Sequence, residues 1–154
     1  MMFSDKPIKE VVEEIELNPR NSTALLDAMG KTINSVERRW TETDEEERAE
    51  KVLFIVITDG GENSSKEFSK PKVFEMIETV KRDHGWEFTF VGANQDAILE
   101  ANQFGIDATQ AINYSETSET VEAVYRSAAR VAKRYRTGNE ISFLESERQE
   151  SYVN

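Results

Sequence analysis

The chain has 154 residues, with 30 acidic against 19 basic side chains, a net charge of -11 and no cysteine. This length fits a single domain, and the lack of cysteine excludes a disulfide framework and a thiolate metal site. The excess negative charge opposes a general nucleic-acid-binding role, and no apolar run approaches the roughly 20 residues of a membrane span. We expect a cytoplasmic protein that binds neither nucleic acid nor membrane.

The residues at the start of the chain predict a broken strand and then a helix. Residues 1–3 form an apolar stub that ends in a turn. Residues 8–17 are interpreted as an edge strand with outward-pointing glutamates, and a helix is the alternative. Ser22 is a helix N-cap, and apolar residues at helical spacing then predict a helix to about Arg39. Residues 41–50 form an acidic connection.

The longest apolar run begins at Val52, ends at Thr58 and leads directly into Asp59, Gly60 and Gly61. It contains no polar alternation, which predicts a strand buried on both faces, as in a parallel sheet between helices. Ligands bind such sheets beyond the carboxyl ends of the strands. Asp59 is therefore a candidate site residue. The alternative is that Asp-Gly-Gly is a plain turn, because these residues are also common turn formers.

Strand and helix patterns alternate through the rest of the chain. A helix is predicted from about residue 70 to His84 and Gly85, followed by a strand at residues 86–91. Asn94 caps a further helix to residue 104. A short strand at residues 108–113 and a long helix to about Arg136 follow. The fold class predicted is α/β, a three-layer, Rossmann-like, mainly parallel sheet with helices on both faces.

The last part of the chain differs in character. The long helix carries a cluster of basic residues, interpreted as a solvated helix face: Arg126, Arg130, Lys133, Arg134 and Arg136. Residues 138–154 form a polar tail with one apolar knot, expected to dock weakly or stay mobile. The predicted organisation is a single domain at residues 1–137 and a polar C-terminal tail.

Two motifs taken together point to a known family. One is STALLDAMGKTI, which begins at Ser22, and the other is EERAEKVLFIVITDGGENSS, which closes the central strand. With GWEFTFVGANQDAI further on, they resemble von Willebrand factor A (vWA) domains, and more narrowly the small bacterial and phage proteins of that family. The likeness covers most of residues 20–112. It rests on the co-occurrence and spacing of the motifs, since neither alone is specific.

The resemblance implies a metal-ion-dependent adhesion site. In the family this site holds Mg²⁺ or Mn²⁺ with oxygen ligands from a DxSxS segment, a threonine at a helix start and an aspartate after a strand. By resemblance, Thr23 is the threonine and Asp59 the aspartate. The neighbouring loops then provide the candidate partner-binding residues: Ser22, Gly60, Gly61, Asn63, Ser64, Asn94 and Asp96. Such domains usually bind a carboxylate of a partner protein at the open coordination position.

The sequence departs from the family at the first ligand segment. Residues 1–22 contain no apolar strand followed by DxSxS, and Ser4-Asp5 does not supply it. Thr23 and Asp59 offer Mg²⁺ only one hydroxyl and one carboxylate. We therefore expect weak or no Mg²⁺ binding.

The missing segment also predicts a gap in the sheet. The family's strand order places the absent strand beside residues 52–58, which leaves one side of that strand unpaired. The gap can be filled by a second copy in a homodimer, by a strand from another protein, or by residues 8–17. A further alternative is a truncated product or a misassigned gene start.

The leading functional hypothesis is a non-enzymatic protein interaction module of vWA type with an incomplete adhesion site, acting as a dimer or through a partner. The alternative is a Mg²⁺-dependent adhesion or chaperone-like domain whose metal site another chain completes. Asp59→Ala would then abolish the effect of Mg²⁺. An enzyme, for example a hydrolase using Asp59 and Thr23, is least favoured, because no nucleophile–base pair or phosphate-binding glycine loop is present.

Overall fold

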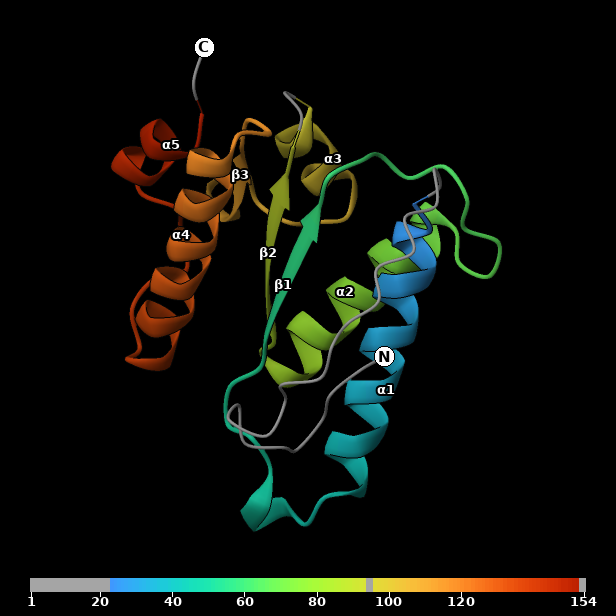
Figure 1. Cartoon of the computed structure of the whole chain (residues 1–154). Coiled ribbons are helices and arrows are strands. Elements are labelled where there is room, and N and C mark those ends of the chain that lie inside the picture. The colour runs from blue at the N-terminus through green and yellow to red at the C-terminus, as the bar shows by residue number, and fades with distance from the viewer. Residues whose placement is uncertain (1–22, 94–95, 153–154) are drawn as a thin grey trace, which may run out of the picture.

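The computed structural model describes residues 23–93 and 96–152. They form a mixed α/β fold of the Rossmann-like kind, built on a three-stranded parallel sheet of order β1-β2-β3 (Figure 1). The strands are β1 (Leu53–Thr58), β2 (Glu87–Gly92) and β3 (Ala111–Asn113). The strand expected at residues 8–17, Ser22 and Asn94 lie outside the described residues. The caps expected from Ser22 and Asn94 are wrong, because the helices that begin at Leu25 and Ala97 have Ala24 and Asp96 as N-caps, and neither side chain accepts a cap hydrogen bond.

Helices connect and follow the strands. The described residues contain five α-helices: α1 (Leu25–Glu42), α2 (Lys70–His84), α3 (Ala97–Gln103), α4 (Ser118–Arg136) and α5 (Glu145–Ser151). Two short 3-10 turns occur at Glu45–Glu47 and Ala108–Gln110. None of the described helices is long and apolar enough to cross a membrane.

Local sequence signals mark the start and the end of α2 and the start of α4. The Ser69 hydroxyl accepts a hydrogen bond from the Lys72 N–H at the start of α2, and Gly85 ends that helix with a φ of 66°, a conformation that favours glycine. Thr117 and Thr120 form a capping box at the start of α4. Strand, helix and strand therefore alternate, which produces the parallel order.

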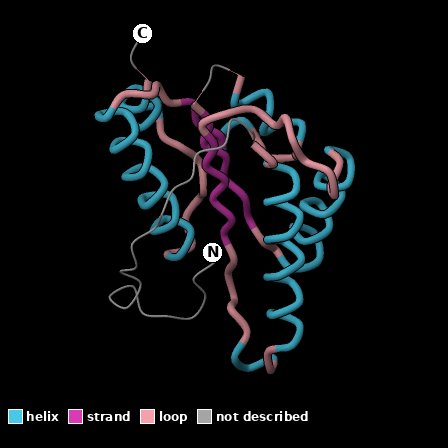
Figure 2. Tube along the Cα trace, turned by 45° about the vertical axis from the view of Figure 1, so that its right-hand side comes forward, coloured by secondary structure: helices cyan, strands magenta, loops and turns pink. Residues whose placement is uncertain are grey.

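Helices cover both faces of the sheet, so the fold has three layers (Figure 2). The helices α1, α2 and α3 pack on one face, where the Phe54 and Phe88 rings stack with centroids 4.6 Å apart. On the other face, α4 packs against β2 and β3, with Val91 and Ile112 in the shared core. The three-layer arrangement that the sequence predicts is present in the described residues.

The expectation that the central strand is buried on both faces is wrong for β1. Its side chains alternate, and Ile55 and Ile57 are 37% and 38% exposed. On this face α4 shares a core with Leu53 at the start of β1, and Ile55 and Ile57 further along the strand remain partly exposed. β1 is the edge of the described sheet, on the side that faces away from β2.

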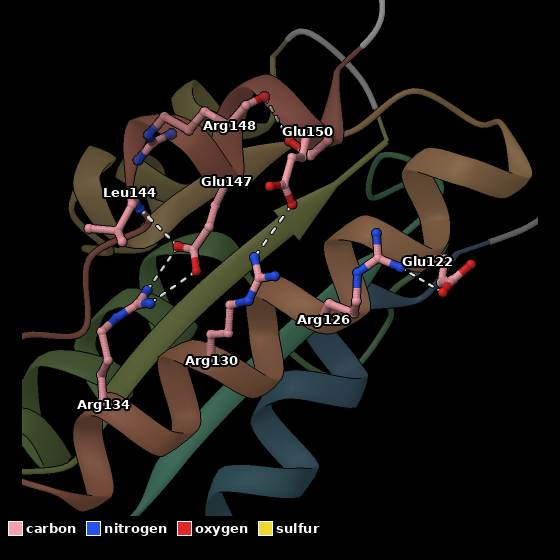
Figure 3. Close-up of polar contacts among 9 residues, drawn as sticks. Glu122, Arg126, Arg130, Arg134, Leu144, Glu147, Arg148 and Glu150 are labelled. Carbon is pink, nitrogen blue, oxygen red and sulfur yellow. Dashed lines mark hydrogen bonds and ion pairs between the residues drawn. The ribbon is translucent and has the colours of Figure 1, made fainter.

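The segment that follows α4 packs onto the domain. Ile141 and Phe143 are buried with the core of α4. Glu147, 1% exposed, accepts two hydrogen bonds of 2.9 Å from the Arg134 guanidinium (Figure 3). The Arg148 guanidinium donates to three backbone carbonyls around the start of β3. Side-chain and backbone hydrogen bonds thus tie residues 138–152 to α4 and β3.

Ion pairs neutralise much of the basic cluster on α4. Arg126 pairs with Glu122 at 2.6 Å, and Arg130 pairs with Glu150 at 3.4 Å (Figure 3). With the Arg134 pair, three cations of the cluster each face a carboxylate. The interpretation as a solvated helix face therefore holds for Arg126, whereas it is wrong for Arg130 and Arg134, which pair with carboxylates of α5.

We expect Arg134→Met to lower the free energy of unfolding by about 3 kcal/mol, because it leaves the buried Glu147 carboxylate without its cation. The double variant Arg134→Met with Glu147→Leu should recover most of the loss. Urea unfolding at pH 7 measures both. Arg126→Met, which breaks an exposed pair, is the matched control and should cost less than about 0.5 kcal/mol. An equal loss in both single variants would contradict this account.

The Glu147 pair also has a defined pH dependence. Burial raises the pKa of this carboxyl, but hydrogen bonds from Arg134 and from the Leu144 N–H outweigh it, so the pKa lies below its ordinary value of 4.5. A lowered pKa stabilises the fold fully above the ordinary value and loses that contribution as the pH falls through the folded-state pKa. The free energy of unfolding of the double variant, Arg134→Met with Glu147→Leu, should therefore fall less than that of the wild type as the pH is lowered below about 4.5.

Candidate functional site

The start of α1 and the loop after β1 meet at the carboxyl end of the sheet. The Thr23 N–H donates to Asn63 Oδ1 at 2.9 Å, and the Asn63 N–H donates to the Thr23 carbonyl at 3.1 Å. A Cβ built on Gly60 would lie 3.3 Å from Thr23 Oγ1. The start of α1 and the loop after β1 are therefore in direct contact through Thr23, Gly60 and Asn63.

Glu62, which the sequence analysis did not single out, ties these two segments together. Its Oε1 accepts from the N–H groups of Ser64 and Ser65, at 3.0 and 2.7 Å. Its Oε2 accepts from the Leu26 N–H at 2.8 Å and from the Ser65 hydroxyl at 2.7 Å. Burial raises the pKa of Glu62, but these hydrogen bonds outweigh it and hold the pKa below its ordinary value.

Asp27 makes the matching set of contacts from the first turn of α1. Its carboxylate accepts hydrogen bonds of 2.9 Å from the N–H groups of Lys66, Glu67 and Phe68. These backbone hydrogen bonds, that of Lys66 first, hold the pKa of Asp27 below its ordinary value. Two carboxylates together fix the loop at residues 62–68 onto the N-terminal end of α1. The signal in the sequence was an acidic residue in the first helical turn, which often binds backbone N–H groups.

The other predicted site residues are dispersed. Asp59 is exposed. Burial of Tyr114 raises the pKa of its hydroxyl, and the negative charges of Asp59 and Glu116 raise this pKa further. Gly61 is exposed with open space around it. The Ser64 hydroxyl is buried without a hydrogen-bond partner among the described residues. Asp96 is exposed at the start of α3, and Ser22 and Asn94 lie outside the described residues.

These residues do not fit a resident Mg²⁺. Over residues 23–93 and 96–152, no group of three or more histidine, cysteine, aspartate or glutamate side chains could hold a metal ion. Thr23 and Asp59 offer one hydroxyl and one carboxylate, whereas Mg²⁺ prefers a near-octahedral set of oxygen ligands. The carboxylates of Glu62 and Asp27 are already occupied by backbone donors. At the carboxyl end of the sheet these two carboxylates therefore hold the loop after β1 against α1.

The second candidate site is the open edge of β1. The carbonyls of Val52 and Thr58 accept hydrogen bonds from β2 and the residue after it, at 3.0 and 3.1 Å. Backbone groups alternate in direction along a strand. Leu53, Ile55 and Ile57 therefore point their N–H and C=O groups away from β2, where no described strand pairs with them.

An apolar groove runs along this edge. Its walls are one face of α1 and the residues of β1, and it holds about 220 Å³. The residues that line it are Leu25, Ala28, Met29, Thr32, Ile33, Phe54, Ile55, Val56, Ile57 and Phe88. Small-molecule pockets usually hold about 300–1,000 Å³, so this volume suits a few side chains of an added strand better. Figure 1 shows α1 on the side of β1 that faces away from β2.

At the amino end of β1 the groove widens, and charged side chains line it. Arg39, Arg48 and Lys51 line it, with Glu47 as the carboxylate among its lining residues. Arg48 donates to the carbonyls of Thr41 and Thr43, and Lys51 donates to the carbonyl of Tyr135 at 2.9 Å. Because carbonyls are neutral, the positive charges of Arg48 and Lys51 persist. The same segment carries Asp44, Glu45, Glu46 and Glu50, so the edge combines an apolar half with an end of mixed charge.

Comparison of the chain with protein-family models, with curated proteins and with solved structures finds no match. The functional argument therefore rests on the geometry of the site.

We expect Glu62→Gln to lower the free energy of unfolding by about 1–3 kcal/mol, because an amide NH₂ group cannot accept the hydrogen bonds that one carboxylate oxygen accepts. Urea unfolding at pH 7 measures the loss. Glu67→Gln is the matched control, since Glu67 is exposed and its side chain bonds only to Lys31; it should change stability by less than about 0.5 kcal/mol.

The pH dependence provides an independent check on Glu62. Its lowered pKa means that the stabilisation is complete above the ordinary value of 4.5 and is lost as the pH falls through the folded-state pKa. The difference in the free energy of unfolding between the wild type and Glu62→Gln should therefore become smaller as the pH falls. A difference that becomes larger as the pH falls would contradict this role of the Glu62 carboxylate.

Proposed function

We propose that this chain is a non-enzymatic protein interaction module of vWA type that acts through the open edge of β1. The proposal combines the resemblance of the motifs around Thr23 and Asp59 with the α/β architecture. The observation that carries it is the row of outward-facing backbone groups at Leu53, Ile55 and Ile57 beside an apolar groove. The partner is another protein or a second copy of the chain.

The edge has the features of a site for strand addition. An exposed strand edge is a template for pairing, and natural proteins usually protect it with charges, proline or a bulge. β1 has none of these between Leu53 and Thr58. Its exposed side chains, Ile55 and Ile57, are instead apolar. In β-augmentation, main-chain hydrogen bonds supply affinity and side-chain pockets supply specificity, and this edge offers both.

The alternative is a Mg²⁺-dependent adhesion or chaperone-like domain whose metal site is completed by another chain. It rests on the proximity of Thr23 to the loop that carries Asp59. The ligand set described above favours the edge-binding hypothesis. A hydrolase is least favoured, because the sequence has no recognisable nucleophile–base pair or phosphate-binding glycine loop.

We expect a fluorescent peptide of about ten residues with alternating valine and threonine to bind the full chain saturably. Ile55→Lys should weaken binding by at least about tenfold, since a lysine on an edge strand opposes the addition of another strand. Fluorescence anisotropy measures both affinities. Leu99→Lys is the matched control, because Leu99 is 62% exposed on α3 and should leave binding unchanged. Equal binding by wild type and Ile55→Lys would contradict the proposed function.

A further inference from the structure

The outer side of β3 is the second edge of the described sheet. The Tyr114 N–H donates to the Gly92 carbonyl of β2 at 3.0 Å. Because backbone groups alternate in direction along a strand, those of Ala111, Asn113 and Ser115 point away from β2. Water or another segment must therefore supply the hydrogen-bond partners of these outward-facing groups.

The helix α5 supplies these partners from the same chain. The Arg148 guanidinium donates to the Ala111 carbonyl at 2.7 Å. The Ser151 hydroxyl donates to the Asn113 carbonyl at 2.9 Å, and the Ser151 carbonyl accepts from the Ser115 N–H at 3.1 Å. α5 thus lies along the edge of β3 where a further strand would otherwise pair.

Polar contacts hold α5 in this position. The helix has seven residues, and none of them has an apolar side chain. Two ion pairs of the described residues join it to α4: Glu147 with Arg134 at 2.9 Å, and Glu150 with Arg130 at 3.4 Å (Figure 3). Isolated helices shorter than about 12 residues are marginal in water. The helical form of α5 therefore depends on its docking, and the docking depends on polar groups.

The residues just before α5 are anchored differently. Ile141 and Phe143 are buried in the core that α4 shares with β2 and β3. The Phe143 N–H also donates to the Thr109 carbonyl at 2.8 Å. Leu144, the next residue, is 49% exposed. Burial of apolar side chains thus holds the chain up to Phe143, and this kind of anchor ends where α5 begins.

We propose that α5 is a releasable cover of the β3 edge, which undocks and unfolds as a unit while the rest of the domain stays folded. Ile141 and Phe143 stay in place, and Leu144 is the hinge. Release exposes the outward-facing backbone groups of β3 and separates Arg130 and Arg134 from their carboxylate partners. The cover controls access to the second edge of the sheet, so the inference does not rest on the binding properties of β1.

Amide hydrogen exchange by NMR on the full chain at pH 7 tests the inference. Ser115 donates to α5, Arg148 donates within α5 to the Leu144 carbonyl, and Val91 lies in the buried centre of β2. We expect Ser115 and Arg148 to have similar protection factors, at least about tenfold below that of Val91. Equal protection of all three amides would show that α5 opens only when the whole domain unfolds, and would overturn the inference.

A charge reversal in the full chain provides the second measurement. Glu147→Lys places a second cation against Arg134 at a buried position, which should release α5 in most molecules. The chemical shifts of α5 should then move to random-coil values, and the protection of Ser115 should fall at least about 100-fold, while Val91 stays protected.

Glu122→Lys is the matched control, because it makes the same change in net charge at an exposed pair with Arg126. It should leave α5 helical and Ser115 protected. Loss of protection at Val91 in Glu147→Lys would show that α5 is an integral part of the domain, and a helical α5 in that variant would show that the ion pair does not hold it. Either result would overturn the inference.

Discussion

The backbone groups on one side of β1 that no described strand pairs are the central constraint on this structure. Leu53, Ile55 and Ile57 present these N–H and C=O groups. Such groups can remain only where water reaches them, or where another segment supplies the partners. An apolar strand edge in water is also a risk for aggregation. The groove beside it limits what can pair there, so the site is selective as well as open.

The acidic side chains at the opposite end of the groove make that selectivity possible. Glu62 and Asp27 hold the loop after β1 against the first turn of α1 through backbone hydrogen bonds. A helix anchored in this way keeps a fixed distance from the strand, so the groove is preformed. Preorganisation of this kind lowers the entropic cost of binding. The junction of Glu62 and Asp27 with these backbone groups thereby acts as a structural clamp.

Much of the fold could be predicted from local patterns, whereas the site could not. Periodicity located α1 to α4, and the apolar run located β1, whereas α5 lies in the segment expected to be a polar tail. The exposure of Ile55 could not be predicted, because it depends on where α4 packs. The contact between Thr23 and the loop after β1 was expected from the resemblance of their motifs to vWA domains. The role of Glu62 and the burial of Glu147 depend on partners far away in the sequence, which no local pattern reveals.

Amide hydrogen exchange by NMR on the full chain tests the central claim most directly. The N–H groups of Phe54, Val56 and Thr58 point toward β2, so they should be protected, while those of Ile55 and Ile57 should exchange rapidly. Addition of the alternating valine–threonine peptide should protect both isoleucine amides. Protection of these amides in the free monomer, or their rapid exchange in the presence of bound peptide, would contradict an open edge that captures a partner strand.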